Sequence, residues 1–195
     1  MSAVPKRLLT PQEYLAQERR AEFKSEYYRG EMFAMAVASY EHSLAKDNLA
    51  AEIKQPLKGG PCRTVTSDLR VKVDATGLYT YPDIVIVCGQ AEFEDSGVDT
   101  LLNPIAIVEV LSESAEAYDR GAKFAQYRQV SSLQEYVLVA QDKPLVERFV
   151  RQADGQWLLS EFRGLEATLE FENVPARVPL AEIYRDVTFA ETPLR

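Results

Sequence analysis

Two short apolar runs, at residues 83–88 and 105–111, constrain the fold of this chain more than any other feature. Both are rich in β-branched residues and too short for free-standing helices, so each predicts a buried strand. Each also carries one carboxylate, because Asp83 begins the first run and Glu109 lies inside the second. A buried, unpaired carboxylate is costly or takes up a proton. The runs therefore predict neighbouring strands whose carboxylates share a cation, and a hard divalent metal would satisfy both.

A further group of charged residues follows the second run. Asp119 and Lys123 lie in a segment, residues 118–127, that repeats its aromatic residues at helical spacing. Lys123 comes one turn after Asp119, so a helix places both side chains on the same face.

Length and charge limit the class of protein. A chain of 195 residues is predicted to form one domain, 1–195, with a proper core. No apolar run approaches the roughly 18 residues of a membrane span, and residues 1–7 lack the apolar core of a secretory signal. We therefore expect a cytoplasmic protein without a membrane partner. The net charge of −8 argues against a protein that coats nucleic acid through a basic surface, but not against an enzyme with a local basic cleft.

The two cysteines, Cys62 and Cys88, are far apart in the sequence and lack metal-site spacing. In a reducing compartment they are predicted to be two buried thiols.

The remaining patterns predict a mixed order of helices and strands. Thr10, Pro11 and Glu13 form a helix start, and this helix is expected to end near Ala21. Residues 24–36 predict a hairpin around Arg29–Gly30 that has Glu26 on one arm and Glu31 on the other. A second helix is expected from Ser39 to Gly59.

The rest of the chain predicts mainly strands. Strands are expected at 62–73, 80–88, 105–111 and 135–140, with a helix near 118–130 and a final hairpin from 145–152 and 157–163. This order predicts a mixed sheet with helices packed on it.

Three segments together resemble a known family. They are Pro82-Asp83, the strand end Val108-Glu109-Val110-Leu111-Ser112, and Asp119-Arg120-Gly121-Ala122-Lys123. In this order they resemble the Uma-type family of restriction-endonuclease-like proteins, within the PD-(D/E)XK nuclease superfamily. The resemblance covers nearly the whole chain and extends to Gly30-Glu31-Met32, to His42 at the head of a helix, to Ser67-Asp68-Leu69-Arg70-Val71, and to Gly89.

The resemblance implies an α+β fold with a restriction-endonuclease-like core. A central mixed sheet of four main strands would be flanked by helices, and the N-terminal and C-terminal hairpins would be additions to it. It also implies a Mg²⁺-dependent (or Mn²⁺-dependent) endonuclease that hydrolyses DNA phosphodiester bonds, with Asp83 and Glu109 as metal ligands. Leu111 occupies the lysine position of the superfamily's Glu-x-Lys motif, so Lys123 is the candidate replacement. Glu31 is a candidate for a further catalytic carboxylate.

Several of these residues also have structural interpretations. Lys123 also suits a solvated ion pair with Asp119, although the functional role is slightly favoured, and His42 is more typical of a helix cap or packed polar group than of a ligand. Arg70 is better explained by an ion pair with Asp68 than by a phosphate contact. The aromatic residues at 79 and 81 are more typical of strand packing than of base stacking.

Two functional hypotheses follow. The first is the metal-dependent endonuclease. The alternative is a catalytically inactive module on the same fold that binds nucleic acid or a partner, favoured by the missing lysine at 111 and the negative charge. A nuclease that cuts both strands suits a two-fold homodimer. The apolar C-terminal segment would either cover the sheet or supply the dimer contact; it includes Phe149, Trp157, Leu158, Leu159, Phe162 and Phe171.

Overall fold

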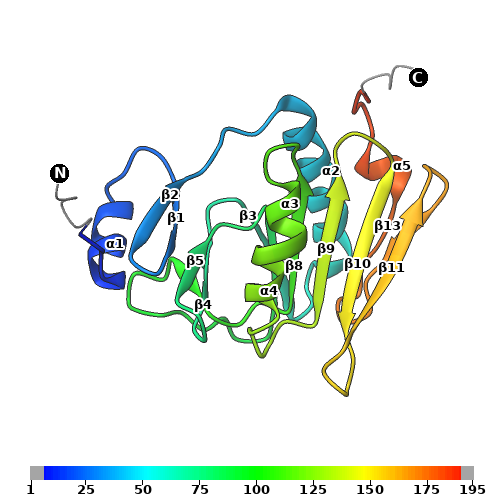
Figure 1. Ribbon diagram of the computed structural model, residues 1–195. Helices are drawn as coiled ribbons and strands as arrows, with labels where there is room; N and C mark the ends of the chain where they lie inside the picture. Colours follow the sequence, from blue (N-terminus) through cyan, green and yellow to red (C-terminus); the bar gives the residue numbers. More distant parts are fainter. Residues whose placement is uncertain (1–6, 190–195) are drawn as a thin grey trace.

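The computed structural model describes residues 7–189, whose largest element is a six-stranded mixed sheet (Figure 1). Its strand order is β11 (Trp157–Arg163), β10 (Leu145–Arg151), β9 (Glu135–Ala140), β8 (Ala106–Leu111), β6 (Ile84–Cys88) and β3 (Cys62–Thr66). Only β8 and β9 run parallel, and the other neighbours are antiparallel. The predicted mixed α+β fold is confirmed. Residues 1–6 and 190–195, including most of the segment tested for a secretory signal, lie outside the described part.

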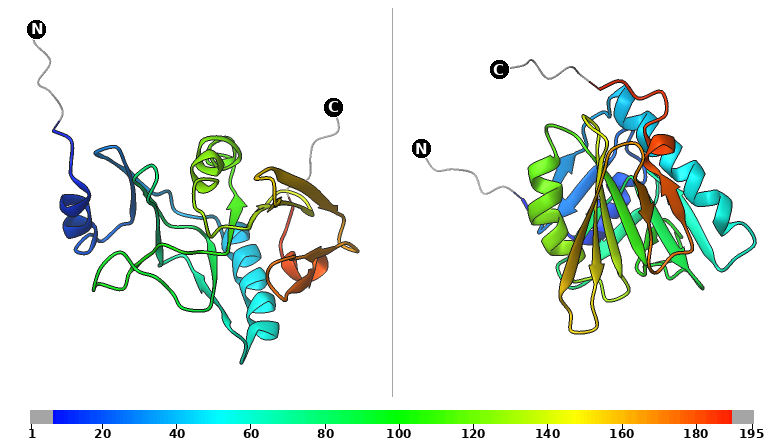
Figure 2. Two further views of the ribbon diagram at one scale, coloured as in Figure 1. Left: turned by 90° about the horizontal axis from the view of Figure 1, so that it is seen from below. Right: turned by 90° about the vertical axis from the view of Figure 1, so that its right-hand side faces the viewer.

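The two faces of this sheet are covered by different helices. On one face, alternate side chains of β6 and β8 pack against α2 (Tyr40–Leu57), with Leu49 and Ile53 fully buried. The opposite face packs against a helical segment formed by α3 (Glu116–Tyr118), η1 (Asp119–Lys123) and α4 (Phe124–Tyr127). Figure 2 shows the sheet between the two, with α2 in cyan and the other segment in green. The apolar runs at 83–88 and 105–111 are thus buried on both sides, as their composition predicted.

A second sheet contains the N-terminal hairpin. Its order is β2 (Glu31–Ala34), β1 (Ser25–Tyr28), β5 (Leu78–Thr80), β4 (Arg70–Val73) and β7 (Thr100–Leu101). Helix α1 (Pro11–Glu18) packs on it through a cluster of Tyr14, Tyr27 and Tyr79. The predicted capping box at Thr10 is present, although α1 ends at Glu18, before Ala21.

Two predicted strands are each divided between the sheets. The strand expected at 62–73 is β3 followed by β4, and the strand expected at 80–88 is β5 followed by β6. Ser67, with φ of 55°, turns the chain after β3, and Pro82 lies between β5 and β6. A left-handed residue and a proline both interrupt regular strand pairing, so the single strands predicted from alternation were wrong at these points.

The helix predicted at 118–130 begins earlier and is less regular. It starts at Glu116, passes through a π-helical turn from Asp119 to Lys123, and ends at Tyr127. Among residues 7–189, no helix has the length and apolar character needed to cross a membrane.

The predicted hairpins are confirmed as β1–β2 and β10–β11. After β11, a two-stranded ribbon of β12 (Thr168–Glu170) and β13 (Arg177–Pro179) leads into α5 (Leu180–Ile183), which packs on α2. The aromatic residues of this C-terminal part mostly pack against the sheet, whereas Leu158 and Leu159 are exposed.

The prediction of two free thiols was wrong. β3 and β6 pair antiparallel with Cys62 opposite Cys88, and the two residues form a disulfide. Their separation in sequence gave no sign of this contact, because the register of the two strands creates it.

Candidate active site

The two carboxylates from the apolar runs lie side by side where β6 meets β8. The strands pair with Ile84 opposite Val108, which places Asp83, one residue before β6, beside Glu109. The contact is reciprocal. The backbone N–H of Asp83 donates to Glu109 Oε2 at 3.2 Å, and the backbone N–H of Val110 donates to Asp83 Oδ2 at 2.9 Å. The register of two buried strands therefore positions both carboxyl groups.

The π-helical turn brings Lys123 to the same place. Its Nζ lies 2.9 Å from Glu109 Oε1, 3.3 Å from Asp119 Oδ1 and 3.4 Å from Glu26 Oε1. Lys123, Glu109 and Asp119 are all buried. Buried charges are tolerated when they pair closely, so this lysine balances part of the negative charge of the cluster.

Strand geometry explains how a lysine outside β8 reaches the carboxyl group of Glu109. The side chains of Glu109 and Leu111 face the same side of the sheet. On that side, Leu111 and Phe124 belong to the same hydrophobic core cluster. Lys123 directly precedes Phe124 and so reaches Glu109 from the helical segment that covers this face. Single π-helical turns are frequent at functional sites.

Burial and charge shift the ionisation of these groups. Burial raises the pKa of the Glu109 carboxyl to about 8, and the Lys123 ammonium opposes part of this effect. Burial likewise raises the pKa of Asp119. Burial acts to lower the pKa of Lys123, but the surrounding carboxylates outweigh it and hold that pKa well above 10.5. Lys123 is therefore charged at neutral pH and acts as a hydrogen-bond donor.

His42 and Tyr127 also contact the carboxylates. His42 Nε2 lies 3.1 Å from Asp83 Oδ2, and the Tyr127 hydroxyl donates to Glu109 Oε1 at 2.9 Å. The Ser39 cap of α2 accepts a hydrogen bond from the backbone N–H of His42, so the start of the helix sets the position of this histidine. The sequence favoured a capping or packing role for His42, and no pattern separated Tyr127 from packing aromatics.

The N-terminal hairpin contributes Glu26 to this cluster. Glu26 Oε2 accepts a hydrogen bond from the Tyr118 hydroxyl at 3.2 Å, and its Oε1 is the atom near Lys123. Glu31, the predicted candidate, lies two residues nearer the turn, opposite Tyr28. The sequence predicted one glutamate on each arm of the hairpin. The register of the two strands is what identifies Glu26 as the residue whose Oε1 lies near Lys123 Nζ.

Arg70 has the structural role that the sequence favoured, with a different partner. It is 3% exposed and donates to the Tyr81 hydroxyl at 2.6 Å. Its ion pair is with Asp99 at 2.9 Å, whereas Asp68 pairs with Lys24. The expected pair of Arg70 with Asp68 was therefore wrong.

A cleft of about 1050 Å³ lies over the carboxylates. Its lining includes Asp83, Glu109 and Lys123, and its sides come from residues 33–39 before α2 and 112–115 after β8. Several apolar side chains on this lining face solvent, and Val37 is 95% and Phe23 77% exposed. The charged cluster is thus accessible from one side and bordered by apolar groups.

The donor atoms suit a magnesium ion. Mg²⁺ prefers oxygen ligands and is usually held by one or two carboxylates, waters and substrate phosphates. Asp83 and Glu109 provide two adjacent carboxylates with lone pairs beyond those used in hydrogen bonds. Within residues 7–189, no group of three or more His, Cys, Asp or Glu forms a ready-made cage for a metal.

The fold and the paired carboxylates define a restriction-endonuclease-like protein. The chain belongs to the Uma2 family, described as "Putative restriction endonuclease", whose model matches residues 11–181. The family resemblance predicted from the sequence is confirmed.

Two uncharacterized proteins of Synechocystis sp. (strain ATCC 27184 / PCC 6803 / Kazusa) are similar to this chain. The protein slr1290 is 34% identical over 181 residues, covering 93% of this chain and 94% of its own. The protein sll1609 is 36% identical over 165 residues, covering 85% and 93%.

A solved structure has a similar fold. It is described as a "putative nuclease belonging to DUF820" from Anabaena variabilis ATCC 29413, and it superposes with a TM-score of 0.74 at 17% identity. The match covers 90% of this chain and 97% of the other. At this identity the likeness shows the fold alone.

Proposed function

We propose that this protein is an endonuclease that uses Mg²⁺, or Mn²⁺, to hydrolyse DNA phosphodiester bonds. The observation that carries the proposal is the 2.9 Å contact between Lys123 Nζ and Glu109 Oε1, beside Asp83. Three groups from separate segments meet in one accessible cleft, in a chain that belongs to a nuclease-like family.

Each group has a separate role in this proposal. Asp83 and Glu109 would hold the metal, which when bound supplies Lewis-acid chemistry and lowers the pKa of water. Lys123 stays protonated, so it would donate a hydrogen bond to the attacking water or to a phosphate oxygen. Tyr127 orients Glu109 through its hydroxyl, in the way that outer partners orient metal ligands. Glu31 remains proposed as a further catalytic carboxylate.

Plasmid nicking tests this proposal. Supercoiled DNA is incubated with wild type, Asp83→Asn and Lys123→Met in Mg²⁺, Mn²⁺ or EDTA, and circular dichroism verifies that each variant is folded. Wild type should nick only with metal, and both variants should lose this activity. Glu113→Gln is the matched control, because Glu113 is an exposed carboxylate on the same cleft. Full activity in folded Asp83→Asn would refute the proposed metal site.

The alternative is a module that binds nucleic acid or a partner protein without cleavage. It is favoured by the exposed apolar side chains of the cleft, and by Lys123 already compensating the carboxylates in this structure. In that case the purified wild-type protein would bind DNA or a partner protein in the presence of Mg²⁺, and the bound DNA or protein would stay uncleaved. Asp83→Asn would bind equally well.

We also propose that residues 1–195 act as a single nuclease-like domain, as a homodimer in the cytoplasm and without a membrane partner. Two copies would match the two strands of a DNA duplex. Light scattering of the purified protein should give twice the mass of one chain.

The Cys62–Cys88 disulfide is a bond more usual in oxidising compartments, so cell fractionation with immediate thiol trapping tests the location and the state of both cysteines.

A further inference from the structure

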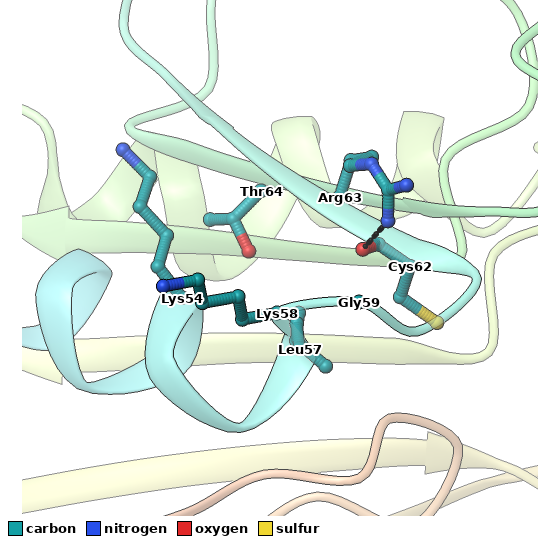
Figure 3. Close-up of a pocket in the computed structure, with 7 residues that line it drawn as sticks. All are labelled: Lys54, Leu57, Lys58, Gly59, Cys62, Arg63 and Thr64. Atoms are coloured by element: carbon teal, nitrogen blue, oxygen red, sulfur yellow. Dashed lines mark hydrogen bonds between the residues drawn. The ribbon is translucent and has the colours of Figure 1, made fainter.

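A second, smaller cavity lies where α2 ends and β3 begins. Its volume is about 400 Å³, and its charged lining consists of Lys54, Lys58 and Arg63. Figure 3 shows Lys54 on the last turns of α2 and Lys58 directly after its end, with Thr64 on the strand beside them. Three cations therefore gather at one hollow in a chain whose net charge is −8.

Within residues 7–189, the surroundings of these three cations leave their charge unpaired. In the part of the chain that the structure describes, none of the three has a carboxylate within ion-pair distance. Arg63 instead donates to the backbone carbonyls of Gly60 and Cys62. Unpaired positive charge in a hollow attracts anions, and this attraction is stronger where other cations lie nearby.

Thr64 adds a polar group to the same cavity. Its Oγ1 is buried, and within residues 7–189 it has no hydrogen-bond partner. Buried polar atoms are normally paired. A hydroxyl can donate to a phosphate oxygen, so an anion in this hollow would provide the missing partner.

The cavity is connected to the cleft by α2 and β3. Lys46, on α2, lines the cleft and donates to the hydroxyl of Ser67, the residue that follows β3. Lys58 comes twelve residues after Lys46, which corresponds to about 18 Å along a helix. At 3.4 Å per nucleotide of a duplex strand, this distance spans about five nucleotides. β3 is the edge strand of its sheet, so no neighbouring strand covers this path.

We infer that this cavity binds a backbone phosphate of the nucleic acid whose scissile phosphate lies in the cleft. This inference rests on the proposed function and extends it, because it gives the substrate a second contact several nucleotides from the reacting bond. The ligand is a phosphodiester held by Lys54, Lys58 and Thr64, and the contact is to backbone and independent of base sequence.

Binding without cleavage tests the inference. We measure the affinity for DNA by fluorescence anisotropy in EDTA, at salt concentrations between 50 and 200 mM. The two labelled ligands are a 20-nucleotide single strand and a 3-nucleotide single strand. The test variant is Lys54→Ala/Lys58→Ala, and the control is Arg163→Ala/Arg177→Ala, which removes two exposed cations from the C-terminal part. Thermal melting verifies that both variants are folded.

The long strand should bind the test variant about tenfold more weakly, and the slope of log affinity against log salt should fall by about 0.7, the value for one lost phosphate contact on a single strand. The short strand and the control should match wild type. Unchanged affinity and slope for the long strand would overturn the inference. Inorganic phosphate is also titrated by calorimetry into wild type and the test variant. Loss of phosphate binding with unchanged binding of the long strand would overturn the inference too, because the cavity would then be a site for free phosphate. The anisotropy assay contains no metal and reports binding alone. Absence of nicking by wild type in the separate plasmid assay with Mg²⁺ or Mn²⁺ would refute the proposed function, and that outcome is distinct from a failure of this inference.

Discussion

Glu109 should make the stability of this fold depend on pH. Its pKa is raised by burial from 4.5 to about 8. Because the folded pKa lies above the unfolded one, the folded protein retains a proton that the unfolded chain releases. The contribution of Glu109 to the free energy of unfolding is therefore fully present below pH 4.5 and is lost as the pH rises to about 8. At about 1.4 kcal/mol per pH unit, the loss over this interval is about 5 kcal/mol.

Urea unfolding measures this effect. Wild type, Glu109→Gln and Glu113→Gln are unfolded at pH 5, 6, 7 and 8 without divalent cations. Between pH 5 and 8, wild type and Glu113→Gln should lose about 3 to 5 kcal/mol more stability than Glu109→Gln. The pKa of Asp119 is raised in the same direction, and Asp119 interacts electrostatically with Glu109, so the difference between the curves measures Glu109 together with its effect on Asp119. Parallel stability curves for Glu109→Gln and wild type would refute the reasoning.

Three further predictions concern other contacts. Tyr127→Phe removes the hydrogen bond to Glu109 and should lower the free energy of unfolding by about 1 to 2 kcal/mol in urea; no loss would mean that the hydroxyl does not support the carboxylate. Arg70→Met should cost about 1 to 3 kcal/mol, because it removes the buried hydrogen bonds to Tyr81 and Thr100 while Asp99 keeps its ion pair with Arg19, yet calorimetric metal affinity should equal that of wild type if Arg70 is purely structural. Leu49→Ala should cost about 2 to 5 kcal/mol by thermal melting, whereas exposed Leu158→Ala should stay within about 0.5 kcal/mol; equal effects would contradict the assignment of the core.

The sequence predicted the centre of the fold because local patterns determine it. Two β-branched runs are buried on both faces, and one misplaced carboxylate in each indicated that they lie together. Helical spacing placed Lys123 on one face with Asp119, and the family resemblance made it the candidate for the lysine missing at 111. The π-helical turn that aims Lys123 at Glu109 was not predicted.

The errors arose where register or a single residue decides the structure. Ser67 divides a continuous alternating pattern between two sheets through its left-handed backbone, and serine carries no strong signal for that conformation. The contact of Glu26 with Lys123 and the pairing of Cys62 with Cys88 depend on which strands become neighbours. Those choices are tertiary, so no local pattern contains them.

Metal titration tests the central claim most directly. Isothermal calorimetry with Mg²⁺ and Mn²⁺ is carried out on wild type, Asp83→Ala and the control Glu113→Gln. If Asp83 and Glu109 hold the metal, wild type and the control should bind one ion per chain and Asp83→Ala should bind none. Equal binding by Asp83→Ala, or no binding by wild type with DNA present, would contradict the account.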